Sequence, residues 1–255
     1  MLQLKASFHY KLDGESLINA IKGKELKERM FVVQYGGNTQ PVKNEGCVVY
    51  DNWRLVGGDE LYNILDDPGQ TKNIASNNPV IFKKMQIFYE KWWSEVEDSA
   101  MNVTPVIIGS AKENPVIFNS NNWIDNAVNT QWNVALAKGP LRGGTTLLQV
   151  ENDGKYIIEI SRWPFHINRH LNSEGPGLSV GGSEIRRGKA LNIATGSIKL
   201  NEDILLTESS KINSVSIRFT QYLKRGLYRF KSWFTDSNGV DICGSYYTRI
   251  ERINN

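Results

Sequence analysis

The sequence has few residues that bind metals or act as nucleophiles. It holds two cysteines and three histidines among 255 residues. Cys47 and Cys243 could pair only across nearly the whole chain, so two buried free thiols are the favoured interpretation. His166 and His170 are four residues apart, a spacing that suits a metal on a helix, but Pro164 and nearby glycines argue against a helix there. We therefore expect no metal site in this chain.

The sequence also lacks long apolar runs and a concentrated basic stripe. No window approaches the roughly 18 to 20 apolar residues of a membrane span, so no membrane partner is expected. Residues 1–14 lack the apolar core and cleavage site of a secretory signal, so we expect the chain as written to stay in the cytoplasm. Net charge is +3 with both signs interspersed. The most basic run, Arg225–Lys231, alternates as a strand with a charged outer face would, and we expect no nucleic-acid partner.

Motifs that carry catalysis are missing as well. The sequence contains no Gly-rich phosphate loop, no CxxC pair and no nucleophile elbow. The Asp51-Asn52 pair has a turn-forming role, and Asp66-Asp67 precedes Pro68 in a turn, where two adjacent carboxylates do not make an oxygen cage for calcium. We therefore predict no catalytic residue in this chain.

What the sequence does contain is a stretch, residues 52–96, around which the first part of the chain is organised. Residues 53–56 and 60–64 predict a hairpin, because Gly57-Gly58 supply the positive φ of a tight turn. Asn78 is a good N-cap and Pro79 a good first residue for a helix over 79–96. Its apolar positions, 81, 85, 88, 92 and 96, predict one stripe that faces a core.

The fold class predicted from these patterns is α+β. Residues 1–100 form a small, mainly antiparallel sheet with a buried strand at 30–35, a strand from 46 to 50, the hairpin and the packed helix. Residues 104–255 form an all-β sandwich, with strands expected at 145–150, 155–163, 192–200, 213–222, 227–235 and 240–250. Loop 164–189 has no strand pattern, and loops of this length are functional or mobile.

A resemblance to a known family rests on several segments in the same order. They are WRLVGGDELYNILDDPGQTKNIA from Trp53, EKWWSEV from Glu90, VVQYGGNTQPVK over Val32–Lys43, and the later runs PVIIGSAKENP, YIIEISRWP and SWFTDSNGVDICGSYYTRI. Together they resemble the C-terminal part of a type I, formylglycine-dependent bacterial sulfatase (arylsulfatase), with its β-rich extension. Nearly all of the chain is covered, but only by the last part of such a sulfuric ester hydrolase.

The resemblance implies a place for each functional group. The formylglycine nucleophile and the calcium of the family belong to the catalytic part that this chain lacks, so the chain is expected to hold no cofactor and to be inactive alone. Lys43, in the loop that borders the substrate in the family, is the candidate substrate-binding residue; the alternative is an exposed loop lysine. The implied partners are a sulfated glycan and an upstream catalytic fragment, and full-length members are periplasmic or secreted.

The alternative hypothesis is a stand-alone carbohydrate-binding or interaction module. Trp123 and Trp132, in an Asn-rich stretch, are the tryptophans considered for glycan contact, whereas burial is expected for Trp53, Trp163 and Trp233 in strands. A sheet that evolved to lie against a catalytic domain should leave an apolar patch exposed when it is alone, and an independent binding protein should not.

Overall fold

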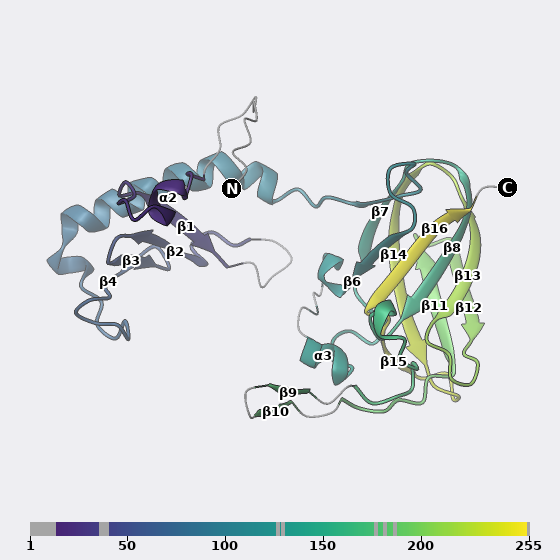
Figure 1. The fold of residues 1–255 in the computed structure, drawn as a ribbon. Coiled ribbons are helices and arrows are strands. Elements are labelled where there is room, and N and C mark those ends of the chain that lie inside the picture. Colours follow the sequence, from purple (N-terminus) through teal and green to yellow (C-terminus); the bar gives the residue numbers. More distant parts are fainter. Residues whose placement is uncertain are drawn as a thin grey trace. The chain divides into compact units, whose positions relative to one another are not determined.

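The computed structural model describes residues 14–35, 41–125, 128, 131–175, 178–180, 183–185 and 188–253. The chain forms two compact units, and the boundary falls between Ser94 and Glu95, within the last turns of a long helix (Figure 1). In the described residues, no helix is both long and apolar enough to cross a membrane.

The first unit is an antiparallel sheet with a helix along one face. Its strands run in the order β1-β2-β3-β4, so each pairs with its neighbour in sequence. The elements are α1 (Ile18–Ile21), β1 (Met30–Gln34), β2 (Gly46–Tyr50), β3 (Trp53–Val56), β4 (Glu60–Asn63) and α2 (Pro79–Ala100). The predicted small antiparallel sheet with a packed helix is therefore confirmed. The layout specific to sulfatases stays an expectation.

The predicted hairpin is formed by β3 and β4. Val56 pairs with Glu60 across the turn, and Gly57 and Gly58 have φ values of 63° and 86°. Residues other than glycine rarely adopt such angles without strain. The Gly-Gly step therefore fixes the register of the hairpin, which brings Leu55 and Leu61 side by side on the face that α2 covers.

Helix α2 runs four residues beyond the predicted end and presents a rotated apolar stripe. Its buried side chains are Met85, Tyr89 and Trp93, whereas Phe88 and Trp92 are only partly buried beside them. The predicted stripe therefore lies on the side that faces the core, with Met85 buried and Ile81, Phe88 and Trp92 partly buried, but the most buried line of the helix runs through Tyr89 and Trp93. The main-chain oxygen of Asn78 accepts from Phe82, as expected of an N-cap residue, and its side-chain amide donates to Ile74 O at 3.1 Å.

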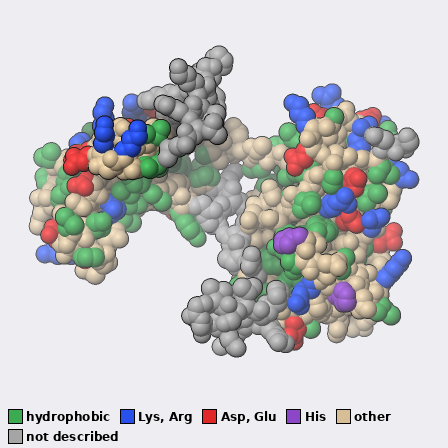
Figure 2. Space-filling model, viewed as in Figure 1, with side chains coloured by type: hydrophobic (Ala, Val, Ile, Leu, Met, Phe, Trp, Pro, Cys, Tyr) green, Lys and Arg blue, Asp and Glu red, His purple; other side chains and the backbone are tan. Residues whose placement is uncertain are grey.

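Strand β1 differs from the prediction because it is not buried on both faces. Val32 contributes to the core beneath α2, but Phe31 and Val33 point to the other face and are 44% and 54% exposed. Register pairs them with Val49 and Cys47 of β2, so that face is apolar as well. Hydrophobic side chains show at the surface of this unit in Figure 2.

The second unit is the predicted β-sandwich, built from two antiparallel-rich sheets. The larger sheet has the order β12-β11-β14-β7-β5, with β15 also paired to β14, and the smaller has the order β13-β8-β16-β6. The strands of the larger sheet are β5 (Val106–Ile108), β7 (Thr146–Val150), β11 (Thr195–Leu200), β12 (Ile204–Ser209), β14 (Gly226–Thr235) and β15 (Asp241–Gly244). Those of the smaller sheet are β6 (Val116–Asn119), β8 (Gly154–Ser161), β13 (Ile217–Leu223) and β16 (Tyr247–Ile253).

One continuous core fills the space between the two sheets. Ile198 and Phe234 reach it from the larger sheet, and Ile158 and Phe219 from the smaller. The rings of Phe118 and Phe230 meet edge to face across the layers, with centroids 6.0 Å apart. Because alternate residues of each strand enter this core, the intervening side chains of the larger sheet are presented on its outer face.

The connections of the sandwich correct several expectations. Loop 164–189 contains a 3₁₀ turn at Phe165–Ile167 and a short hairpin of β9 (Leu178–Val180) and β10 (Ser183–Ile185). Asn168 is left-handed, with φ of 45°, so His166 and His170 do not share a helix. Strands β5, β6 and β12 were not predicted.

Both cysteines are free thiols, as expected, but only Cys243 is buried, and Cys47 is partly exposed. Burial raises the pKa of the Cys243 thiol to about 12, and burial also raises the pKa of Cys47. Neither thiol is therefore a ready nucleophile near neutral pH.

Candidate functional site

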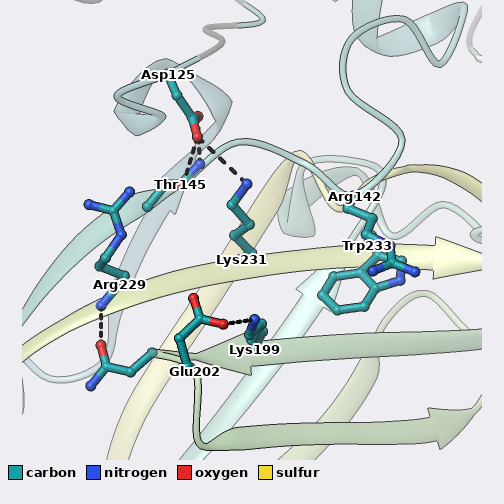
Figure 3. A pocket seen from close by; sticks show the side chains of 9 residues that line it. Asp125, Arg142, Thr145, Lys199, Glu202, Arg229, Lys231 and Trp233 are labelled. Carbon is teal, nitrogen blue, oxygen red and sulfur yellow. Dashed lines mark hydrogen bonds and ion pairs between the residues drawn. The ribbon is translucent and has the colours of Figure 1, made fainter.

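The candidate site is a depression of about 360 Å³ on the outer face of the larger sheet (Figure 3). Strands β11 and β14 form its floor, and the loops before β7 and after β11 form its walls. Its lining residues are Asp125, Arg142, Thr145, Lys199, Asn201, Glu202, Arg229, Lys231 and Trp233. The site is therefore lined mainly by hydrogen-bonding and charged side chains, with one large aromatic ring among them.

The alternation of β14 places three of these residues in a row. Phe230 and Phe234 point into the core, so Arg229, Lys231 and Trp233 point outward. The register between β11 and β14 then sets Lys199 directly opposite Lys231 and Ser197 opposite Trp233. The positions of these groups are thus determined by the backbone hydrogen bonds of the sheet rather than by flexible loops.

Asp125 is held at one wall of the depression. Its carboxylate accepts from the backbone N–H and the hydroxyl of Thr145, both at 2.7 Å, and lies 3.6 Å from Lys231 Nζ. Burial raises the pKa of this carboxyl, but the bonds from Thr145 and the charge of Lys231 outweigh burial, so the pKa lies below its usual value.

Glu202 occupies the opposite wall and pairs with Lys199. The hydrogen bond from Lys199 lowers the pKa of Glu202. A carboxyl that acts as a general acid near neutral pH needs a raised pKa, and both carboxyls here are shifted the other way. The charges of this site are therefore suited to binding a ligand rather than to donating a proton.

Trp233 forms the end of the depression, beneath Arg142. The guanidinium carbon of Arg142 lies 5.5 Å from the centroid of the indole, and Nε donates to Asp241 at 2.6 Å. Trp233 is only 6% exposed, whereas the Arg142 side chain is 68% exposed. The exposed guanidinium of Arg142 therefore covers part of an indole that is itself almost fully buried.

The residues considered from the sequence lie elsewhere. Lys43 belongs to the first unit, where its Nζ contacts Glu90 Oε2 of α2 at 2.7 Å, and its substrate role stays a prediction. Trp123 packs against Tyr246, with ring centroids 5.8 Å apart, and does not line the depression, so its contact with a glycan stays a prediction. Trp132 lies on α3 (Gln131–Ala135), is partly exposed and does not line the depression.

A second depression of similar size, about 350 Å³, lies between residues 170–173 and 210–214. His170 and Lys211 are its charged or titratable side chains, and it lacks a tryptophan or a carboxylate. In the described part of the chain, no group of three or more His, Cys, Asp or Glu side chains could hold a metal ion. The site on the larger sheet therefore offers the richer set of contacts.

One strand of this site was predicted from the sequence, although the site itself was not. The alternation over Arg225–Lys231 correctly predicted a strand with a charged outer face, which is β14. Trp233 is a buried strand residue, as expected, and it continues the same alternation on the outer face of β14. The sequence pattern that could have revealed the site is the alternation from Arg229 through Lys231 to Trp233, which places all three side chains on one face of the strand.

No protein-family model and no curated protein matches this chain. A solved structure with some likeness is the carbohydrate-binding module CBM6cm-2 of Cellvibrio mixtus lichenase 5A in complex with cellotriose, with a TM-score of 0.29 and 12% identity over 56% of this chain and 100% of that one. Another is a ruminal GH26 endo-β-1,4-mannanase, with a TM-score of 0.28 and 11% identity over 55% of this chain and 26% of that one. At such low TM-scores neither likeness assigns a function to this chain.

Proposed function

We propose that the β-sandwich unit is a carbohydrate-binding module whose ligand lies in the depression on the larger sheet. The observation that carries the proposal is the arrangement there of an indole ring among donors and acceptors that rigid strands position. Saccharides present apolar C–H faces for an aromatic ring and hydroxyl groups for amide, ammonium and carboxylate groups. The site supplies both kinds of partner within one concave surface.

Contact between a sugar and Trp233 requires Arg142 to move aside. The pair between Arg142 and Asp241 is largely exposed on the Arg142 side. Exposed ion pairs contribute about 0–1 kcal/mol, so a ligand that stacks on the indole can displace the guanidinium at little cost. Once displaced, Arg142 lies at the rim of the depression, where it can donate to the ligand.

The test compares two tryptophans on binding to polysaccharides. Trp233→Ala should weaken binding about tenfold or more, which corresponds to about 1.4 kcal/mol of lost stacking. Trp132→Ala is the matched control and should leave the affinity unchanged, because Trp132 does not line the site. Affinity electrophoresis of the full chain in gels that contain soluble glucans, mannans or acidic polysaccharides measures both.

Melting curves must accompany this test, because Trp233 is largely covered. Trp233→Phe keeps a ring beneath Arg142 and should give an intermediate affinity even if the alanine variant is unstable. Loss of binding in Trp132→Ala, with binding retained in both Trp233 variants, would place the glycan at α3 and contradict the proposed site.

The resemblance to sulfatases provides a second candidate, in which the chain is the terminal portion of such an enzyme. Its support is the apolar face of β1 and β2, where Phe31 and Val33 remain exposed opposite α2. An exposed apolar face of this kind fits a unit that packs against a further domain. On this proposal the partner is the catalytic fragment, which would bring the formylglycine and the calcium.

The second candidate is tested by adding that fragment back. The chain alone should not turn over 4-methylumbelliferyl sulfate, because it lacks the nucleophile. Turnover that rises when a catalytic fragment encoded upstream is added, and that Val33→Asp reduces, would support the proposal. Turnover by the repurified chain alone, abolished by a chelator, would contradict it.

A further inference from the structure

The depression on the larger sheet contains a pair of like charges that the fold alone does not require. Lys199 of β11 and Lys231 of β14 are direct register partners and point to the same face. Like charges directly opposite each other on neighbouring strands destabilise a sheet. A pair of hydroxyl side chains, such as the neighbouring Ser197 and Thr207 whose oxygens are 2.8 Å apart, would carry no such cost.

The nearby carboxylates only partly neutralise this pair. Glu202 binds Lys199, but Asp125 is engaged mainly by Thr145 and lies 3.6 Å from Lys231. Together with Arg229 and Arg142 the lining holds four cationic side chains and two carboxylates. Because Arg142 is also paired, with Asp241 beside the lining, the excess of positive charge comes to one cation, that of Arg229. Figure 3 shows how these side chains lie.

Arg229 supplies the group best suited to hold an anion. Its backbone N–H donates to Asn201 Oδ1 at 2.8 Å, which fixes the main chain at the edge of the depression. Within the described residues no hydrogen bond or ion pair engages its guanidinium, although its charge helps to lower the pKa of Glu202. A guanidinium can bind the two oxygens of a carboxylate or sulfate at once, and lysines supply mobile point charges beside it.

We infer that the ligand of this site is an acidic saccharide, whose carboxylate or sulfate group lies among Arg229, Lys231 and Lys199. The inference rests on the proposed function and adds the chemical class of the ligand. The anion relieves the repulsion between the paired lysines, while the remainder of the sugar lies toward Trp233. Neutral saccharides lack the first of these contacts and bind more weakly.

The experiment uses matched polymers on the full chain at about 0.15 M salt. The probes are polygalacturonate with its methyl ester, for the carboxylate, and dextran sulfate with dextran, for the sulfate. At least one acidic polymer should bind at least tenfold more tightly than its neutral counterpart, and the pair that shows the difference identifies the anion. Affinity should fall as salt rises, because the contacts are partly exposed.

Two substitutions of equal charge provide the control. Lys231→Met should reduce the affinity for the acidic polymer at least tenfold and leave binding to the neutral polymer nearly unchanged. Lys155→Met removes the same charge from an exposed position on β8 of the other sheet and should have no effect. Arg229→Gln should resemble Lys231→Met, and it is the second variant if the lysine change disturbs folding.

The outcomes separate the inference from the function on which it rests. Equal affinity for the acidic and neutral members of both pairs would overturn the inference and leave the proposed function intact. An equal loss in Lys155→Met and Lys231→Met would show diffuse attraction of polyanions and also overturn it. Failure to bind any polysaccharide, neutral or acidic, would overturn both.

Discussion

Replacing Arg162 by Met should destabilise the β-sandwich by about 3 kcal/mol or more, because it removes a fully buried guanidinium that donates to three carbonyls at once. Arg162 is fully buried and follows β8. Its Nη1 donates to Ser173 O at 3.2 Å, and its Nη2 donates to Ala135 O at 2.9 Å and to Lys189 O at 2.7 Å. One side chain thus ties the end of α3 to two points of the connection that follows β8.

The charge of Arg162 is stabilised in an unusual way. Within the described residues no carboxylate pairs with it, and the guanidinium carbon lies 4.3 Å from the centroid of the Trp163 ring. Burial lowers the pKa of this arginine. Carbonyl dipoles and the face of an indole therefore stabilise this positive charge in place of a counter-ion. A neutral side chain of the same length cannot satisfy those carbonyls.

The measurement is the free energy of opening of β8 and β16 amides, from hydrogen exchange of the full chain in increasing urea. Arg169→Met is the matched control, because Arg169 donates to a single carbonyl, that of Glu174, in the same connection. It should cost less than about 1 kcal/mol. An equally small loss in Arg162→Met would show that water replaces the guanidinium and that α3 and the connection after β8 do not depend on it.

The second large effect is expected in the first unit, where Trp93→Ala should cost about 3 to 5 kcal/mol. Trp93 is 3% exposed at the centre of the core beneath α2, and its ring stacks on Tyr89 with centroids 6.3 Å apart. Truncation leaves a large cavity between the helix and the sheet, and the ring of Tyr89 loses one of its two aromatic partners.

Trp92→Ala provides the comparison, because Trp92 is the next residue of the helix and is only partly buried. It should cost about 1 to 2 kcal/mol. Protection of the β3 and β4 amides against hydrogen exchange measures both losses in the intact chain. A larger loss for Trp92 than for Trp93 would show that the helix packs on the stripe predicted from the sequence, and it would contradict the central role of Trp93.

Local chemistry explains the parts of the fold that the sequence predicted. The Gly57-Gly58 step determined the hairpin of β3 and β4 because its geometry depends on those two residues alone. The alternation at Ile217 and Phe219 likewise placed β13 correctly, with both side chains buried. Strand β12 was missed because its residues 204–206, Ile-Leu-Leu, do not alternate, although only Leu205 of the three is largely exposed.

The candidate site depended on information that no local pattern carries. Lys199 and Lys231 face each other only because β11 pairs with β14 in one register. The burial of Trp123 depends on such contacts as well: its indole lies against Gly144 and Gly244, where a Cβ atom would come within 2.6 Å and 2.7 Å of it. Those contacts come from distant parts of the chain, so the Asn-rich surrounding sequence did not indicate this burial.

The register of β11 and β14 means that some residues of the site lie on paired strands and others in connecting loops. The two ammonium groups arise from strands whose spacing, about 4.8 Å, is set by backbone hydrogen bonds that substitutions on the surface do not alter. Asp125, Arg142 and Glu202 instead lie outside the strands of the sheet. If the site binds an acidic saccharide as proposed, changes in those connecting segments can alter which saccharide is preferred, while the strands keep the spacing of the two lysine positions. Descendants of this chain could therefore diversify in specificity without rebuilding the charge pair at the centre of the site.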